Sequence, residues 1–298
     1  MTISYGSDFG HIEGDARVQI IRRIKELKTA LAKLREDGGT VALVPTMGAL
    51  HAGHMQLVRE AGQQADHVVA SIFVNPTQFG PNEDLDAYPR QEEADAKLLR
   101  EAGVAILWAP TAEEMYPHGY ATNISVSGVS MGLCGGSRPG HFDGVATVVS
   151  KLFHQVEPDI ALFGEKDYQQ LAVLRRMVLD LDFPLEIVGV PTVRDDDGLA
   201  LSSRNTYLSA EHRAAAAHFP KALKEGIEKL ESGAAVDETL AEIGARILAS
   251  GFESVDYVAL CDADSLVELQ VLDRPARLLS AARIGSTRLI DNMAVRPR

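Results

Sequence analysis

Two histidines lie close together directly after a predicted strand, at the point where a helix is expected to begin. They are His51 and His54, within the run PTMGALHAGH at residues 45–54. Imidazole N–H groups, glycines that let the backbone approach a ligand, and the N–H groups of a helix start all suit nucleotide phosphates. Ligands of open parallel sheets bind where strands end, so this run is the first candidate for a phosphate site.

The same histidines have two other interpretations. One ring could cap the helix while the other satisfies a core carbonyl, or the pair could hold zinc. A helical zinc site usually places its histidines four residues apart with a carboxylate nearby, and the run His51-Ala52-Gly53-His54 has neither feature. The glycine-rich P-loop and dinucleotide-binding motifs are also absent from the sequence. Phosphates would therefore have to be held in another way.

A second polar segment, GEKDYQQ at residues 164–170, also follows a predicted strand and enters a helix. Lys166 can place a positive charge on a phosphate, and Gln170, one helical turn later, can hydrogen-bond a small polar substrate. An exposed charged turn would have the same composition. The functional interpretation gains support because this segment and the two histidines are expected at the same edge of the sheet.

A third segment, GLALSSRN at residues 198–205, contains adjacent hydroxyl groups followed by Arg204. These donors could close on a triphosphate and stabilise charge on departing pyrophosphate, although a solvated interdomain loop would look similar. Residues 75–79, NPTQF, follow another predicted strand and add an amide and an aromatic ring at the same edge.

Strands and helices alternate through most of the chain, which predicts an α/β fold: a Rossmann-like parallel sheet with helices on both faces. A leading helix is expected between Asp15 and Gly38, because apolar residues from Ile20 to Leu34 recur at helical spacing. The predicted strands are residues 40–44, 68–74, 104–108, 160–163 and 186–193, and the helices among them are residues 54–64, 92–102 and 144–156.

The sequence changes character near residues 190–195, where the turn signal Asp195-Asp196-Asp197-Gly198 occurs. We expect two domains, residues 1–192 with the candidate ligand site and residues 193–298 as a smaller α+β domain. The elements expected in the second domain are helices over residues 210–231 and 236–249 and strands over residues 254–260, 276–282 and 287–291.

The net charge of the chain narrows the classes of molecule that the protein is expected to bind. The 298 residues carry 29 Lys+Arg and 42 Asp+Glu, a net charge of −13 at pH 7, which disfavours general nucleic-acid binding because that depends on cationic side chains. No apolar run approaches the roughly 20 residues that span a bilayer, and the N-terminus lacks a secretory signal pattern. The two cysteines, Cys134 and Cys261, give no disulfide framework. A cytoplasmic enzyme that binds neither nucleic acid nor membranes is expected.

Four motifs in a fixed order together resemble one enzyme family. They are residues 45–51 with His54, residues 73–76 with Gln78 and Phe79, residues 164–170 and residues 197–205. From about residue 18 to the C-terminus the chain is similar to the pantothenate synthetases (pantoate–β-alanine ligases), which share a His-x-Gly-His signature with other nucleotidyltransferases. The resemblance implies a homodimeric, ATP-dependent ligase with Mg²⁺ accompanying the nucleotide.

The resemblance also implies a two-step reaction. Pantoate would attack the α-phosphate of ATP to give pantoyl adenylate and pyrophosphate, and β-alanine would then displace AMP to give pantothenate. His54, His51 and Lys166 would be the catalytic residues, with His54 as proton donor. Gln78 and Gln170 would bind pantoate, with Gln78 also near β-alanine. The residues implied for ATP binding are Met47, Gly48, Ala49, Leu50, His51, Ala52, Gly53, His54, Gly164, Glu165, Lys166, Asp167, Val193, Leu201, Ser202, Ser203 and Arg204.

Two other functions are compatible with the nucleotide motifs alone. A related nucleotidyltransferase could transfer AMP or CMP to a phosphorylated acceptor and stop there, and a nucleotide-sensing module could keep the fold without turnover. The contexts of Gln78 and Gln170 favour the ligase, since they match its pantoate-binding segments. The loop at residues 135–141 matches a family segment near the active site, and a mobile glycine-rich linker would explain it equally well.

Overall fold

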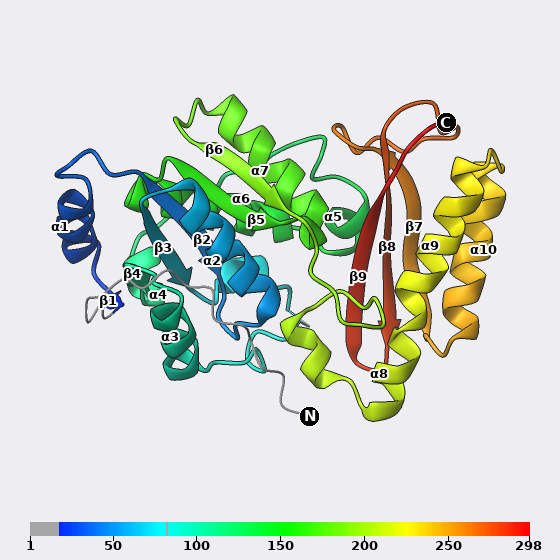
Figure 1. Cartoon of the computed structure of the whole chain (residues 1–298), viewed down its shortest axis with the longest axis horizontal. Helices are drawn as coiled ribbons and strands as arrows, with labels where there is room; N and C mark the ends of the chain where they lie inside the picture. The colour runs from blue at the N-terminus through cyan, green and yellow to red at the C-terminus, as the bar shows by residue number, and fades with distance from the viewer. Residues whose placement is uncertain (1–17, 82) are drawn as a thin grey trace.

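The computed structural model describes residues 18–81 and 83–298. The described chain forms two parts that lie side by side, each with its own sheet (Figure 1). The larger part has a six-stranded sheet and the smaller part a three-stranded sheet. The predicted Rossmann-like sheet with a smaller α+β unit after it is confirmed. The expected start of the leading helix at Asp15 lies outside the described residues.

All strands of the larger sheet are parallel, in the order β1-β4-β3-β2-β5-β6. From the central strand β2 the chain builds outward through β3 to β4, and it then returns to the other side of β2 to form β5 and β6. This reversal creates a topological switch point between β2 and β5, where ligands of such sheets usually bind. The strands are β1 (Gln19–Ile21), β2 (Val41–Thr46), β3 (His67–Ile72), β4 (Ile106–Trp108), β5 (Ile160–Gly164) and β6 (Glu186–Val190).

Helices cover both faces of this sheet because successive strand residues point to opposite sides. Val41 and Leu43 of β2 pack in one apolar cluster with α1, α6 and α7, whereas Ala42 and Val44 pack in another with α2 and α3. Near-continuous apolar strands are typical of a sheet buried on both faces. The helices of this part are α1 (Ile24–Leu34), α2 (Ala52–Gln64), α3 (Glu92–Glu101), α4 (Ala112–Met115), α5 (Leu133–Ser137), α6 (His141–Val156) and α7 (Tyr168–Asp180).

The smaller part is an antiparallel sheet, β7-β8-β9, with α9 and α10 on its outer face (Figure 1). Its core includes Phe219, Leu223 and Leu278. On the other face, Leu279 packs with Tyr168 of α7, so this face joins the smaller part to the larger one. The elements are α8 (Ala210–Ala216), α9 (His218–Glu231), α10 (Val236–Ala249), β7 (Ser254–Asp262), β8 (Ala276–Ile284) and β9 (Thr287–Val295).

Two predicted helices differ from the structure by more than a shift of a few residues at one end. Ile20 lies in the edge strand β1, which pairs with β4, and the first helix begins only at Ile24. The single helix expected over residues 210–231 is divided at Ala217 into α8 and α9. Pro220 has no N–H to donate to the carbonyl of Ala216, so the helical ladder is interrupted and restarts with Pro220 in the first turn of α9.

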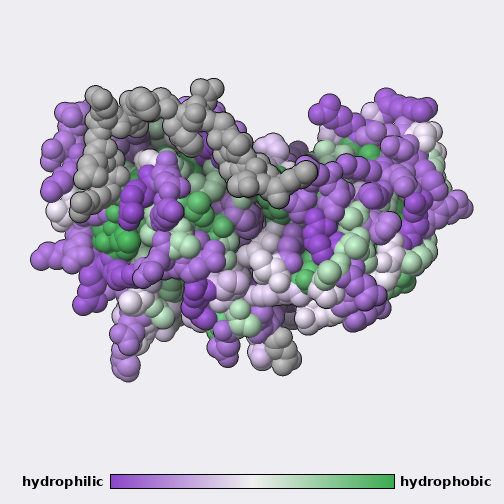
Figure 2. Space-filling model, turned by 60° about the horizontal axis from the view of Figure 1, so that its bottom comes forward, coloured by the Kyte–Doolittle hydropathy of each residue, from purple (hydrophilic) through white to green (hydrophobic). Residues whose placement is uncertain are grey.

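The surface of the molecule is mostly hydrophilic on the face shown in Figure 2, where hydrophobic residues gather in small patches. Across the described ranges, none of the helices combines the length and apolar character needed to cross a membrane. Cys134 and Cys261 are both buried with free thiols.

Candidate active site

The candidate site lies at the carboxyl edge of the parallel sheet, beside the switch point between β2 and β5. The loop after β2 leads to His51 and His54, the turn after β5 carries Lys166, and the segment after β3 carries Gln78. One cavity of about 230 Å³ is lined by all of these side chains and by Arg204. Parallel strand order therefore brings together the segments that the sequence analysis singled out.

The rings of His51 and His54 both accept hydrogen bonds from backbone N–H groups at the start of α2. His51 is the N-cap residue, and its Nδ1 atom accepts a hydrogen bond from the Gly53 N–H at 3.1 Å. The Nδ1 atom of His54 accepts one from the His51 N–H at 3.3 Å, and the two ring centroids are 4.1 Å apart. Because both Nδ1 atoms are acceptors, each neutral ring carries its proton on Nε2.

The two imidazoles are neutral near pH 7. Burial, followed by the positive charge of Lys166, lowers the pKa of His51 to about 4. Burial and the neighbouring His51 lower the pKa of His54 to about 3. A neutral ring with its proton on Nε2 donates a hydrogen bond without bringing a positive charge. Positive charge at this site therefore comes from lysine and arginine.

The loop between β2 and α2 is held from behind by Asp95 of α3. This carboxylate is fully buried and accepts hydrogen bonds from the N–H groups of Ala49 at 2.8 Å and Leu50 at 2.9 Å. Gly48 has a φ of +84°, and a Cβ added to it would lie 3.1 Å from the Asp95 carboxylate. These loop residues shape the approach to the helix, and their amides are directed away from the cavity by Asp95.

The structure separates the implied site residues into two groups. Five of them do not line the cavity: Gly48, Ala49, Leu50, Ala52 and Glu165. Those that line it are Met47, His51, Gly53, His54, Gln78, Gly164, Lys166, Asp167, Gln170, Val193, Leu201, Ser202, Ser203 and Arg204.

Gln78 is positioned by a buried amide, Asn75. Asn75 is 1% exposed, and its Nδ2 atom donates to the Gln78 Oε1 atom and to the Gly144 carbonyl, both at 3.1 Å. The Gln78 amide in turn contacts the sulfur of Met47 at 3.2 Å. Helix α6 approaches η1 (Pro76–Gln78) so closely that a Cβ on Gly144 would lie 2.4 Å from the Thr77 carbonyl oxygen. The Gln78 amide thus has a fixed place in the cavity wall.

Lys166 belongs to η2 (Glu165–Asp167), the turn directly after β5, and its Nζ atom lies 3.9 Å from the Asp167 carboxylate. The Nδ2 atom of Asn292 on β9 donates to the carbonyl oxygens of Glu165 and Lys166, both at 2.9 Å. Gln170, one turn later on α7, lines the same cavity. The smaller part of the molecule therefore fixes the turn that carries Lys166.

Arg204 lies in η3 (Ser203–Tyr207), in another wall of the cavity. Its guanidinium group makes two hydrogen bonds with the Asp84 carboxylate, at 3.0 and 2.8 Å. Ser202 caps η3 by accepting a hydrogen bond from the Arg204 N–H, and the Tyr88 hydroxyl lies 3.2 Å from the Ser203 hydroxyl. Hydroxyl and guanidinium donors together form this wall.

Several side chains that line the cavity or hold its walls were not among the predicted site residues. Arg138 and His141 also line the cavity, with His141 2.8 Å from the Gln78 carbonyl oxygen and Arg138 bound to Glu83. Burial, then the charge of Arg138, lowers the pKa of His141 to about 4. The loop at residues 135–141 therefore contributes two side chains to the cavity wall. Asn292 comes from a distant strand, and no local pattern marks it.

The two histidines are not arranged as a zinc site. Their Nδ1 atoms accept backbone N–H groups. Within residues 18–81 and 83–298, no group of three or more histidine, cysteine, aspartate or glutamate side chains could hold a metal ion.

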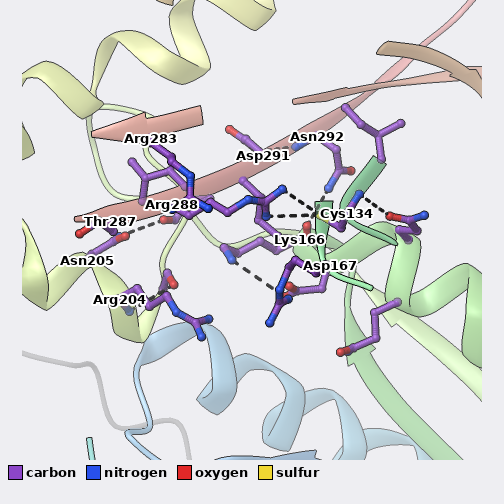
Figure 3. Close-up of a pocket in the computed structure, with 18 of the residues that line it drawn as sticks. Cys134, Lys166, Asp167, Arg204, Asn205, Arg283, Thr287, Arg288, Asp291 and Asn292 are labelled. Atoms are coloured by element: carbon purple, nitrogen blue, oxygen red, sulfur yellow. Dashed lines mark hydrogen bonds and ion pairs between the residues drawn. The ribbon is translucent and has the colours of Figure 1, made fainter. Parts of the chain in front are cut away.

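A larger cavity of about 640 Å³ adjoins the first and extends along β9 (Figure 3). Both cavities are lined by Arg138, Lys166, Gln170 and Arg204. Ligands that reach the smaller cavity can therefore extend toward the β-sheet of the smaller part.

Comparison with known proteins identifies relatives along almost the whole chain. The family model described as pantoate-β-alanine ligase matches residues 19–294. The pantothenate synthetase of Sphingopyxis alaskensis is 63% identical over 278 residues, which cover 93% of this chain and 100% of the relative. That of Novosphingobium aromaticivorans is 63% identical over 286 residues, which cover 94% and 100%.

Solved structures agree with these relatives. The pantothenate synthetase of Thermus thermophilus has a TM-score of 0.88 and 49% identity, covering 94% of this chain and 100% of that one. The pantoate-β-alanine ligase of Francisella tularensis, solved in complex with β-γ ATP and β-alanine, has a TM-score of 0.78 and 34% identity, covering 93% and 97%. The chain therefore belongs to the pantoate–β-alanine ligase family and is a pantothenate-forming ligase.

Proposed function

We propose that this ligase joins (R)-pantoate to β-alanine in two steps that both take place in the cavity at the carboxyl edge of the sheet. In the first step, a carboxylate oxygen of pantoate attacks the α-phosphorus of ATP, which forms pantoyl adenylate and releases pyrophosphate. In the second step, the amine of β-alanine attacks the acyl carbon, which forms the amide bond of pantothenate and releases AMP.

The observation that carries this proposal is the convergence of unlike donors on one cavity. His51 and His54 offer neutral Nε2–H groups after β2, Lys166 offers an ammonium group after β5, and Arg204 offers a guanidinium group from the start of the smaller part. Attack of a carboxylate on a phosphate brings two anions together, so positioning and charge neutralisation are the main tasks of the enzyme. A nucleophilic side chain is not required.

The proposed roles at the phosphates follow from these donor types. His51 and His54 hydrogen-bond phosphate oxygens through Nε2–H, with His54 donating its proton toward the departing pyrophosphate. Lys166 and Arg204 compensate the negative charge that grows in the transition state.

The rest of the proposed ATP site forms the walls of the cavity. The five implied residues outside the cavity lining are proposed to support the nucleotide site from behind. They are Gly48, Ala49, Leu50, Ala52 and Glu165. The wall residues proposed to contact ATP are Met47, Gly53, Gly164, Asp167, Val193, Leu201, Ser202 and Ser203.

Gln78 and Gln170 are proposed to hold pantoate, with Gln78 also near β-alanine. A side-chain amide can donate to a carboxylate and accept from a hydroxyl group, and pantoate carries both. Phe73, Val145 and Leu152 line the same cavity, which gives the two methyl groups of pantoate an apolar surface.

A single-turnover experiment tests the two-step route. With enzyme in excess over ATP, and with pantoate and Mg²⁺ but no β-alanine, we expect stoichiometric pyrophosphate release and enzyme-bound pantoyl adenylate detected by mass spectrometry. Addition of β-alanine should then release pantothenate and AMP. Pantothenate formation without an adenylate would contradict the proposal. Release of a nucleotide-linked product that ignores β-alanine would indicate the other nucleotidyltransferase activity, which the family match does not favour.

Further proposals rest on the resemblance alone. Mg²⁺ is proposed to enter on ATP, bound mainly by phosphate oxygens and water, which are ligands that this ion prefers. The enzyme is proposed to be a cytoplasmic homodimer, with residues 1–192 binding ATP and pantoate and residues 193–298 closing over the site as a lid. Activity with EDTA tests the need for Mg²⁺, and sedimentation analysis tests the homodimer. Cell fractionation tests the location, and small-angle scattering with and without ligands tests the closure.

A further inference from the structure

Two arginines line the candidate site, and each is held by a carboxylate of the same short segment. Arg204 binds Asp84 at 3.0 and 2.8 Å, and Arg138 binds Glu83 through two hydrogen bonds of 2.6 Å. Glu83 and Asp84 are neighbours in sequence, whereas the arginines come from separate loops. Both guanidinium groups are engaged through two parallel N–H groups, the same geometry by which arginine binds a phosphate.

We propose that Asp84 is a resident anion that occupies Arg204 in the free enzyme and gives up this position when the phosphates of ATP bind. The inference rests on the proposed placement of the ATP phosphates at Arg204. It assigns to Asp84 a role in setting nucleotide affinity, which no motif in the sequence indicates.

The need for a resident anion follows from the surroundings of Arg204. The side chains of Arg204 and Asp84 are 29% and 24% exposed, so an unpaired guanidinium here would lose part of its hydration without compensation. Burial tends to raise the pKa of Asp84, but the hydrogen bond and charge of Arg204 outweigh it and hold that pKa below its usual range. The carboxylate is therefore ionised at neutral pH and keeps the arginine paired.

An exchange of partners has a measurable consequence for ATP. Phosphate oxygens can bind the Arg204 guanidinium group only after the Asp84 carboxylate has left it. The free energy of the Asp84–Arg204 ion pair is therefore lost from the binding free energy of the nucleotide. Removal of the Asp84 charge should therefore strengthen ATP binding. If Asp84 instead only held Arg204 in place, the same change would weaken ATP binding, so the sign of the effect separates the two roles.

Calorimetric titration with the non-reactive analogue α,β-methylene ATP and Mg²⁺, without pantoate, measures this sign directly. The variant Asp84→Asn keeps the size of the side chain and removes its charge. We expect its Kd for the analogue to fall about fivefold, the factor that corresponds to the upper end measured for partly exposed ion pairs. In an Arg204→Gln background the same change should alter Kd by less than about twofold, because the competing pair is already absent.

Asp86→Asn is the matched control. Asp86 is an exposed acid of the same segment, and the described residues include no ion pair to its carboxylate. Its Kd should match that of the wild type, and equal tightening in this variant would attribute the effect to net charge and overturn the proposal.

The outcomes also separate this inference from the proposed function. A wild type that binds the analogue, together with an Asp84→Asn variant of the same melting temperature that binds it no better, overturns the exchange alone. A wild type that does not bind the analogue overturns the proposed ATP site, and the exchange with it.

Discussion

The side-chain amide of Asn292 donates to the carbonyl oxygens of Lys166 and Glu165, both at 2.9 Å, across the junction between the two parts of the molecule. Asn292 is 4% exposed, and its backbone N–H binds Asp291. Asp291 in turn holds Arg194 through two hydrogen bonds of 2.7 Å. The position of the catalytic lysine candidate is therefore tied to a strand of the smaller part, which makes Asn292 a positioning residue.

Replacement of Asn292 by alanine removes the two hydrogen bonds that its side-chain amide donates to the turn that carries Lys166. We expect kcat to fall about tenfold, which corresponds to the loss of about 1.4 kcal/mol of hydrogen bonding. In a Lys166→Ala background, the Asn292→Ala change should alter kcat less than about twofold, because there is no lysine left to misplace. A tenfold loss in both backgrounds, measured by steady-state kinetics, would show that Asn292 acts only on the general structure.

The donors of the cavity should matter individually for turnover. We expect His51→Ala, His54→Ala and Lys166→Ala each to lower kcat by about 10² or more, the usual effect of losing one preorganised donor at developing charge. Gln56→Ala, two residues after His54 on α2 and outside the cavity lining, should keep wild-type turnover. Near-normal rates in all three cavity variants, in the pyrophosphate-release assay, would remove these residues from the site.

The close approach of α6 to η1 predicts a selective effect on pantoate. A methyl group at Gly144 would lie 2.4 Å from the Thr77 carbonyl oxygen, so Gly144→Ala must push apart the helix and the turn that carries Gln78. We expect the KM for pantoate to rise about tenfold with the KM for ATP little changed, since small displacements at a binding group are costly.

A matched glycine provides the control for this experiment. In Gly62→Ala the nearest contact to the new methyl group would be Val68 at 3.9 Å, an ordinary packing distance. The variant should therefore keep both KM values and gain up to about 1 kcal/mol of unfolding free energy from the higher helix propensity of alanine. Equal pantoate KM values in Gly144→Ala and the wild type would contradict the role assigned to the contact.

Local patterns predicted the elements whose own residues decide their structure. Helix α10 begins and ends where the sequence analysis placed it, at Val236 and Ala249, because its apolar residues alone define a buried face. The strand β1 was missed because its three residues are extended only through pairing with β4. The break at Ala217 was missed because Pro220 acts four residues away, on the carbonyl of Ala216.

The same limit applies to the candidate site. The segments containing His51, Lys166 and Arg204 could be predicted, because loops after parallel strands meet at one edge of the sheet. The supporting partners could not. Asp95 lies on α3 behind the loop, and Asn292 lies on a strand of the other part. Their roles depend on tertiary contacts between segments far apart in sequence, which leave no mark on either segment alone.

The depressed histidine pKa values predict how stability changes with pH. Burial lowers the pKa of His54 to about 3 and that of His51 to about 4 in the folded protein, whereas the pKa of an unfolded histidine is near 6.5. Between these values the unfolded chain binds more protons than the folded one, so the free energy of unfolding falls as the pH is lowered from about 6.5 to about 4. Carboxylates with lowered pKa values, such as Asp84, lose their contribution only near and below pH 4.

Urea unfolding of the wild type and of His54→Asn at pH 7 and pH 5 tests this prediction. In the wild type, His54 should contribute about 1 to 2 kcal/mol to the difference between the two pH values, because each unit of pKa shift corresponds to about 1.4 kcal/mol within the window where only the unfolded form is protonated. The His54→Asn variant should show a smaller difference, since asparagine does not titrate. The exposed His118 provides the control: His118→Asn should keep the wild-type difference. An undiminished difference in His54→Asn would mean that His54 is not the neutral, buried donor on which the proposed chemistry depends.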